Sequence, residues 1–531
     1  MASAPSTRGV KAEATHAEPE LTAGDIGRRA ASGAALLTAK GLLAQALGLV
    51  STIVVARLLV PHQLGLYAIA VTISTFLLML GSGVGMGAAL IRRTAPPEHD
   101  DLRAYVALQL FVSLALVGVV VLATRPFGLV GQLTAVMVVS APITAFGGAS
   151  LVVVERQLLY KRIATAETAA IVVYYGWTVV TVFIGWGLWG LATATVARAI
   201  VSTAFLIALA PTGIIWPRYN RRRVRALLGI GLQVQAVDFV FALRDQILVL
   251  GAAAIGSVSV VAYWSLILRA LQAPQSLLFT LLRVSFPAMS RTRSVGRDPG
   301  EMLPRLLAAA TILTGTLLAP LAGAPALVPL LFGERWSPAA DALVLTCLAV
   351  VIHTPVAIAV QSYLWTAGDG RSPLRASIAD AVAVVVIGLP LVPVLGVLGL
   401  AIGGVACATI HTAILARAVE KRTDVHVFRH IGIPVLDWMI AAAAAWACAQ
   451  GPGPLVMRAV LSSFVAVGLY LALIFLTRRE LTLTLARQYW PWIRRGVLRR
   501  GKGPGDNQRL DMTSPQTTER LQTGEPRLTA R

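Results

Sequence analysis

Charge is scarce in this chain of 531 residues, and acidic side chains are scarcer than basic ones. Only 13% of the residues are Asp, Glu, Lys or Arg, whereas 56% are hydrophobic. An ordinary soluble domain carries about a quarter of its residues as charges. These proportions exclude a soluble globular protein and indicate a chain that lies in a membrane.

Cysteines and enzyme motifs are also scarce. The three cysteines, Cys347, Cys407 and Cys448, all fall in apolar stretches and offer neither a disulfide framework nor the spacing of metal ligands. No P-loop, GxSxG or HExxH motif occurs, and no loop carries an acidic cluster. We therefore expect no cofactor, no resident metal and no ATP-driven transport. The predicted outer connections are about ten residues or shorter, which argues against a membrane glycosyltransferase, ligase or polymerase.

Apolar stretches of about 20 residues fill most of the chain, each long enough to cross a hydrocarbon core of about 30 Å. They predict an all-α integral membrane protein with about 14 transmembrane helices. The predicted spans are 34–57, 65–90, 104–123, 130–154, 165–185, 187–210, 226–251, 257–282, 304–332, 338–362, 374–393, 396–416, 432–449 and 455–477.

The placement of the basic residues explains the net charge of +21. With a cytoplasmic N-terminus, the predicted outer connections hold only Arg57, Arg125, Arg335 and Arg458, and the inner loops hold most of the other Lys and Arg residues. The positive-inside rule then places both termini in the cytoplasm and the protein in the plasma (inner) membrane. The positive charge is therefore topological, and we expect no binding of nucleic acid.

The two ends of the chain differ from the apolar middle. Residues 1–32 are polar and predict a disordered cytoplasmic segment, and the first span is too long for a cleaved signal sequence. Residues 480–500 mix Tyr and Trp with Arg, which is typical of an interfacial segment on anionic lipid. Residues 501–531 are polar and predict a disordered tail.

An internal repeat divides the apolar part in two. Residues 187–200 align with 396–409 without gaps, and half of the positions are identical. A second, weaker similarity sets Glu167, near the start of the fifth predicted span, opposite Asp380, near the start of the eleventh. A chance match between apolar segments remains the alternative. The repeat predicts two pseudo-symmetric six-helix lobes, 33–212 and 226–420, joined by a basic linker, 213–225, and followed by two extra helices in 430–478.

Several phrases of the sequence resemble a known family. They are VVARLLVPHQLGLYAIAVTIS (54–74), VVERQLLYKRIATAETAA (153–170), GLWGLA (187–192), LLGIGLQVQAVDFVFALRDQILVLGAAA (227–254) and LLFGERWSPAADAL (330–343). In this order they are similar to the Wzx-like polysaccharide flippases of the MOP transporter superfamily. The resemblance implies alternating access, by which undecaprenyl-diphosphate-linked oligosaccharide moves to the outer leaflet for O-antigen, capsule or exopolysaccharide assembly. It also implies that a polysaccharide polymerase and co-polymerase are possible partners.

Basic residues within the spans are candidates for holding a diphosphate. A charge at mid-membrane is costly, so it usually faces a cavity or a partner. Arg198 and Arg269 lie near the middle of their spans, and a guanidinium can hold phosphate oxygens with paired donors. Gln272 extends the polar face of Arg269, and Lys40 is a candidate for the cytoplasmic entrance. Interhelical ion pairs are the alternative, and Arg57 is expected to extend towards the lipid headgroups.

A polar stripe on span seven is the candidate coupling site. Gln235, Asp238, Asp245 and Gln246 fall within about 100° of one another on a helix. Their carboxylates predict binding of a proton or a sodium ion, with ion pairing to the arginines as the alternative. Pro274 is expected to open the helix of span eight.

Two membrane histidines, His353 and His411, are interpreted as isolated hydrogen-bonding groups and stay outside the predicted site.

Other transporter classes stay open at this point. A multidrug or small-cation antiporter of the same superfamily would present net acidic groups to its cavity, which disfavours it here. A lipid II flippase shares the anionic cargo. A passive channel fits poorly with a two-lobed repeat.

Overall fold

The structure is a computed structural model that describes residues 23–81, 87, 90–91, 97–225 and 246–479. The described residues are almost all helical, and none of them forms a strand. The chain divides into two compact units, Met1–Leu471 and Ala472–Arg531. In the second unit the described residues are the last turns of a helix, where the Arg478 amide donates to the Ile474 carbonyl. Everything below concerns the first unit.

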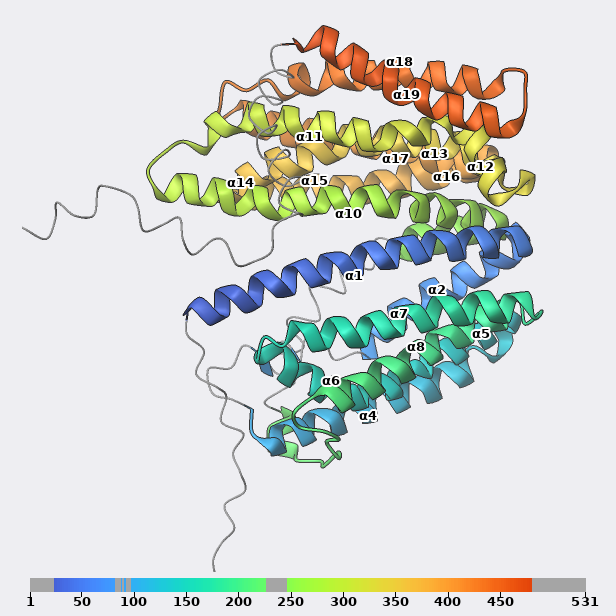
Figure 1. The fold of residues 1–531 in the computed structure, drawn as a ribbon, viewed down its shortest axis with the longest axis vertical. Helices are drawn as coiled ribbons and strands as arrows, with labels where there is room; N and C mark the ends of the chain where they lie inside the picture. The colour runs from blue at the N-terminus through green and yellow to red at the C-terminus, as the bar shows by residue number, and fades with distance from the viewer. Residues whose placement is uncertain (1–22, 82–86, 88–89, 92–96, 226–245, 480–531) are drawn as a thin grey trace, which may run out of the picture. The chain divides into compact units, whose positions relative to one another are not determined.

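The N-terminal lobe comprises the helices up to residue 209, coloured blue to green in Figure 1. Its helices are α1 (Ala23–Leu58), α2 (Pro61–Gly81), α4 (His99–Ala123), α5 (Gly128–Val138), α6 (Ser140–Arg156), α7 (Tyr160–Phe183) and α8 (Leu188–Leu209). The predicted linker, residues 213–225, follows α8, and its residues 221–225 are helical.

The C-terminal lobe follows from residue 246 to residue 420. Its helices are α10 (Val258–Ser294), α11 (Leu303–Leu318), α12 (Ala324–Phe332), α13 (Pro338–Val356), α14 (Ser362–Thr366), α15 (Arg371–Ala383), α16 (Leu389–Leu395) and α17 (Val397–Glu420). Two further helices, α18 (Val427–Gln450) and α19 (Leu455–Thr477), complete the chain's helical part.

Twelve of the described helical stretches are long and apolar enough to cross a membrane. The long helix α10 and the short apolar helix Gln246–Ile255 lie where predicted spans eight and seven were placed. The chain is thus a multi-pass membrane protein, and the prediction of an all-α fold with about 14 spans is confirmed.

Local interruptions within the spans differ from the predicted continuous helices. Val139 separates α5 from α6, and a 3-10 segment, Ala319–Gly323, separates α11 from α12. Prolines explain these breaks, because Pro142 and Pro320 lack the N–H that would donate to the preceding turn. In contrast, α10 continues through Pro274, where the sequence predicted an opening of the helix.

The two lobes repeat each other in detail. Gly187 and Gly396, aligned by the repeat, precede α8 and α17 with nearly equal dihedral angles, φ 53° and ψ −125° against φ 58° and ψ −132°. Only glycine adopts such a conformation without strain.

A matched pair of hydrogen bonds extends the same alignment. The Oγ1 of Thr203 on α8 donates to the carbonyl of Ile143 on α6 at 3.2 Å. In the other lobe, the Oγ1 of Thr412 on α17 donates to the carbonyl of Ile352 on α13 at 3.4 Å. In both bonds the two residues are 60 positions apart in the sequence. Thr203 aligns with Thr412, and Ile143 aligns with Ile352, at the same offset as Gly187 with Gly396. These matching contacts agree with the predicted correspondence of α6 and α8 to α13 and α17.

The lobes meet through α1 and α2 on one side and α10 and α12 on the other. Helix α1 packs along α7 of its own lobe, and α2 packs along α10 of the C-terminal lobe. Helix α1 also reaches α10 and α12 near its C-terminal end. In Figure 1, α1 and α10 are drawn as neighbouring helices of the two lobes. This junction encloses the candidate site.

Candidate functional site

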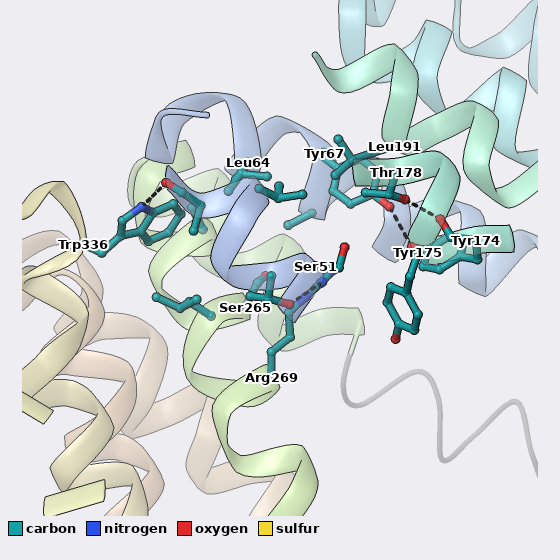
Figure 2. A pocket seen from close by; sticks show the side chains of 16 residues that line it. Ser51, Leu64, Tyr67, Tyr174, Tyr175, Thr178, Leu191, Ser265, Arg269 and Trp336 are labelled. Atoms are coloured by element: carbon teal, nitrogen blue, oxygen red, sulfur yellow. Dashed lines mark hydrogen bonds between the residues drawn. The ribbon is translucent and has the colours of Figure 1, made fainter. Parts of the chain in front are cut away.

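A partly open cavity lies at the junction of the two lobes. Helices α1, α2, α7 and α8 line it from one lobe, and α10 with Trp336 line it from the other. Figure 2 shows the side chains that surround it. Its polar lining consists of hydroxyl groups and one arginine: Ser51, Thr52, Tyr67, Tyr174, Tyr175, Thr178, Ser265 and Arg269.

Arg269 is the charged side chain that lines this cavity. It is exposed to the cavity space, and its Nη1 donates to the Oγ1 of Thr52 on α1 at 3.4 Å. No acidic partner is recorded for it among the described residues. Gln272, one turn further along α10, is also exposed. The spacing of three residues keeps the two side chains on one helical face.

Three tyrosines form the wall opposite Arg269. The hydroxyls of Tyr67 on α2 and Tyr174 on α7 are 3.3 Å apart. The rings of Tyr174 and Tyr175 meet edge to face, with centroids 5.0 Å apart. The hydroxyl of Tyr175 approaches Gly48 of α1 so closely that a Cβ there would lie 2.8 Å from it. The wall thus combines phenolic donors with ring faces.

Arg198 does not line the cavity but lies behind this wall. Its guanidinium carbon is 5.8 Å from the centroid of the Tyr174 ring, a cation–π arrangement. The side chain is exposed. The Tyr174 ring therefore contacts Arg198 and also lines the cavity that Arg269 lines.

Lys40 is engaged elsewhere. Its Nζ pairs with the Glu167 carboxylate and so joins α1 to α7 away from the lining of the cavity. Its charge is therefore balanced within the N-terminal lobe. Glu167, which the sequence comparison set opposite Asp380, is the acidic partner in this contact.

The predicted polar stripe on span seven falls mostly outside the described residues, which end at 225 and resume at 246. Gln235, Asp238 and Asp245 belong to the part that is not described. Gln246 begins the short apolar helix Gln246–Ile255, and its Oε1 is buried with no hydrogen-bond partner among the described residues. A buried amide oxygen of this kind is costly unless it is satisfied.

One end of the junction is closed by contacts between the lobes, and we call it the Trp336 end. The indole Nε1 of Trp336, 1% exposed, donates to the carbonyl of Ala56 at 2.9 Å. Arg57, which was expected to reach the lipid headgroups, donates to the carbonyls of Leu330 and Leu331 on α12. These contacts tie the C-terminal end of α1 to the opposite lobe.

A close backbone approach adds to this closure. A Cβ at Gly65 of α2 would collide with the carbonyl oxygen of Val258 at the start of α10. The Tyr263 ring of α10 packs edge to face on Trp336, with centroids 5.9 Å apart. Glycine at position 65 therefore permits the contact between α2 and α10.

The opposite end carries ion pairs within each lobe. In the N-terminal lobe, the linker residue Arg223 donates to Asp101 and to Glu98 at the start of α4, both at 2.7 Å. These hydrogen bonds raise the pKa of the Arg223 guanidinium above its usual value. The basic linker is thus held on α4.

In the C-terminal lobe, Asp369 has a similar role between α14 and α15. Its carboxylate accepts from the Ser372 hydroxyl at 2.6 Å and pairs with Arg422 at 2.9 Å. The Ser372 hydroxyl is the main cause that lowers the pKa of Asp369, and Arg422 adds to it.

The sequence missed the tyrosines, Thr52 and Trp336 as site residues. A tyrosine doublet in the middle of an apolar span, Tyr174 and Tyr175, was the available signal, because phenol groups inside a membrane require partners. Thr52 and Trp336 gave no such signal, since their positions depend on how the lobes meet. Among the residues that the structure covers, no group of three or more His, Cys, Asp or Glu side chains could hold a metal ion.

Comparisons with known proteins agree with this architecture. The model of a family described as polysaccharide biosynthesis protein matches residues 54–341. The lipid II flippase MurJ in an inward closed conformation superposes with a TM-score of 0.66 and 14% identity, over 84% of this chain and 99% of that chain. An inward-facing multidrug resistance MATE family transporter of the MOP superfamily gives a TM-score of 0.51 and 18% identity, over 71% and 96%. No curated protein matches the chain in sequence.

Proposed function

Because the chain belongs to the polysaccharide biosynthesis protein family and has the fold of MOP superfamily transporters, we propose that it is a lipid-linked oligosaccharide flippase. Its cargo is an undecaprenyl-diphosphate-linked glycan, which it moves from the cytoplasmic to the outer leaflet. The glycan then serves the assembly of O-antigen, capsule or exopolysaccharide.

The observation that carries this proposal is Arg269 in the cavity between the lobes. A guanidinium in a low-dielectric cavity attracts an anion much more strongly than it does in water. Its planar set of donors suits the oxygens of a diphosphate. The hydroxyls of Tyr67 and Tyr174 add neutral hydrogen-bonding groups on the facing helices.

The two lobes contribute different side chains to the site. Arg269 and Gln272 project from α10 of the C-terminal lobe, whereas the tyrosine wall belongs to the N-terminal lobe. A cargo held between them contacts both lobes at once. Rocking of the lobes would then move the headgroup while the lipid tail stays in the bilayer.

The Trp336 end is the outer end in this proposal, and both termini are cytoplasmic. Arg57 and Arg335 lie at the Trp336 end, and the many basic loops lie at the opposite end, as the positive-inside rule requires. Closure by Trp336 and Arg57 then blocks the outer side, so cargo enters from the cytoplasmic leaflet of the plasma (inner) membrane.

Two members of the same superfamily are the competing functions. A multidrug or small-cation antiporter is disfavoured, because the described lining of the cavity carries an arginine and no carboxylate. A lipid II flippase would use the same diphosphate chemistry, and it is the second candidate because the MurJ fold is similar over 84% of this chain.

The flippase proposal also includes an energy source and partner proteins. A proton or a sodium ion bound by the acids of span seven, Asp238 and Asp245, would supply the energy. A polysaccharide polymerase and co-polymerase would consume the cargo at the outer leaflet.

Deletion of the gene followed by identification of the accumulated lipid-linked saccharide tests the function. We expect an undecaprenyl-diphosphate glycan on the inner leaflet, and its accumulation again when Arg269→Gln or Arg198→Gln replaces the wild-type protein. Arg125→Gln, an exposed arginine at the Trp336 end, is the matched control and should export normally. Accumulation of lipid II in its place would favour the second candidate, and normal export by Arg269→Gln would remove this residue from the site.

A further inference from the structure

Two histidines on separate helices of the C-terminal lobe lie against each other. The rings of His353 on α13 and His411 on α17 have centroids 4.5 Å apart and an interplanar angle of 69°. His411 is 5% exposed, and His353 is half-buried. Each histidine is isolated within its own span of the sequence, so this contact between spans was not predicted. Neither lines the cavity between the lobes.

The internal repeat shows that the packing of these helices does not require imidazole rings. The matched threonine hydrogen bonds of the two lobes place Thr144 and Ser202 at the positions that correspond to His353 and His411. In the N-terminal lobe, α6 and α8 pack together with these two small side chains. The histidine pair is thus a feature that distinguishes the C-terminal lobe.

An acidic residue lies at the same level on the neighbouring helix. Helix α15 packs along α17 with a buried face that includes Ala376 and Ala383. Asp380 is four residues from Ala376 and three from Ala383, so it belongs to this face. Ala376 shares a core cluster with Leu415. One turn further along both antiparallel helices, Asp380 and His411 come to the same level.

Helix geometry changes one turn after two members of this trio. A π-helical segment, Ala357–Gln361, begins four residues after His353, and a second, Val384–Gly388, begins four residues after Asp380. Both segments pack against α17. Such bulges are rare and are found mostly at functional sites, because each one weakens the regular hydrogen bonding of a helix.

Other charged and titratable groups lie on the elements that pack against the two helices of the pair. The helices packed against α13 and α17 are α10, α11, α12, α15, α16 and α18, with the short segments Ala319–Gly323, Glu334–Trp336, Ala357–Gln361 and Val384–Gly388. Apart from Asp380, the charged and titratable residues of these elements and of α13 and α17 are Tyr263, Arg269, Arg283, Arg291, Arg293, Arg305, Glu334, Arg335, Asp341, Cys347, Arg371, Arg375, Cys407, Arg417, Glu420, Arg429, His430, Asp437 and Cys448. Asp437 is buried on α18, where it interacts electrostatically with Tyr470. Asp380 is therefore the acid on the helix face that meets α17 at the level of the pair.

We propose that His353, His411 and Asp380 form a proton-binding site within the C-terminal lobe. Imidazole changes charge between about pH 5 and 8. Two neighbouring imidazoles do not both ionise readily, because like charges repel, so the pair takes up one proton from water and returns it to water. The Asp380 carboxylate stabilises the cation that forms.

Protonation at this place changes the packing of α13 against α17, the helices that carry the pair. A coupling of this protonation to transport rests on the proposed flippase function, whereas the binding of the proton does not. The site would supply a coupling ion on the lobe opposite to the tyrosine wall.

The first experiment measures the proton itself in the full-length protein in lipid nanodiscs. The chain has seven histidines, so NMR of protein labelled with ¹⁵N at histidine resolves few imidazole signals. We expect two signals that titrate as one coupled group between pH 8 and 5 and that disappear together in the variant His353→Thr/His411→Ser, which copies the N-terminal lobe. Asp380→Asn should make protonation require a lower pH. His62→Gln, an exposed histidine, should leave both signals unchanged. Rings that stay neutral to pH 5, or that titrate independently, would overturn the proposal.

The second experiment measures the coupling without cargo. Spin labels at Ile184 and Val394, both exposed near the ends of their helices, report the distance between the lobes at the Trp336 end. We expect the distance distribution to shift between pH 8 and 5.5, and the shift to be lost in His353→Thr/His411→Ser. A pH shift that survives in this variant would overturn the coupling. Failure of the flippase function itself would be seen separately, as an unchanged lipid-linked glycan pool after gene deletion.

Discussion

The indole of Trp336 donates its N–H to the main-chain carbonyl of Ala56, and this 2.9 Å hydrogen bond joins the two lobes. Trp336 is 1% exposed, so it is part of the buried contact between a loop of one lobe and the end of α1 in the other. A single side chain thus reports whether this end of the junction is closed.

Trp336→Phe should favour opening of the Trp336 end. Phenylalanine keeps an aromatic ring for Tyr263 but leaves the buried Ala56 carbonyl without its donor. A hydrogen bond of this kind contributes about 1 kcal/mol, which corresponds to about a fivefold change in the equilibrium between closed and open states. Distances between spin labels on the two lobes measure this change. Trp186→Phe, an exposed tryptophan, is the control, and equal populations in all three proteins would contradict the prediction.

Gly65→Ala should act in the same direction through the backbone. The added methyl group collides with the Val258 carbonyl, a main-chain atom that cannot rotate away, so α2 and α10 must separate. We expect a larger open population and lower thermal stability of the closed form. Gly118→Ala on α4 is the matched control, because nothing lies within 4 Å of its Cβ position. If both alanine variants behave alike in spin-label distances and in thermal unfolding, the close approach has no role in closure.

Arg269→Lys should retain part of the export that Arg269→Gln loses. Lysine keeps the positive charge but presents a point charge in place of a planar set of donors, so we expect a reduction of about tenfold in the rate. The measurement is the rate at which labelled lipid-linked glycan becomes accessible at the outer leaflet. Equal rates for Lys and Gln variants would show that the charge of Arg269 does not hold the cargo.

Tyr67→Phe tests the tyrosine wall separately. The variant keeps the buried ring but removes the hydroxyl that faces Tyr174, so the bundle should stay folded while one neutral donor is lost. We expect a weaker apparent affinity for the glycan, by several-fold, with an unchanged maximal rate. Tyr219→Phe, an exposed tyrosine in the linker, is the control. Wild-type affinity would exclude the Tyr67 hydroxyl from cargo binding.

Stability should depend on Asp369 at acid pH. The pKa of Asp369 is lowered in the folded protein, chiefly by the Ser372 hydroxyl, so its contribution is present above the ordinary Asp value of about 3.9. The contribution is lost as the pH falls through the lowered value. Wild-type protein should therefore exceed Asp369→Asn in melting temperature from pH 7 to about 5, and the difference should shrink below about pH 4. Asp424→Asn, an exposed acid, should show no such pattern, and a constant difference down to pH 3 would contradict the assignment.

Helix positions could be predicted well because a membrane imposes long apolar stretches. The last predicted span, 455–477, coincides with α19, and 187–210 differs from α8 by one residue at each end. The breaks at Val139 and at 319–323 were not foreseen, since an apolar average over 20 residues hides a single proline. The π-helical segments leave no mark in composition at all.

The site was harder to predict than the fold. Arg269, which lines the cavity, could be singled out because a charge inside a span stands out against its apolar neighbours. Tyr67 and Trp336 were missed, because amphipathic rings are common in membrane proteins and their roles depend on contacts between distant segments. The pairing of His353 with His411 also joins two spans that only the packed lobe brings together.

Arg57 has a further consequence for the helix that it touches. The carbonyls of Leu330 and Leu331 belong to the last turn of α12, where a helix has no internal donors to offer. Arg57 therefore acts as a C-terminal cap supplied by the other lobe. When the lobes part, this cap is withdrawn and the end of α12 is left to fray. The local stability of one short helix thus follows the relative position of the two lobes, and amide hydrogen exchange at residues 330–333 would record it.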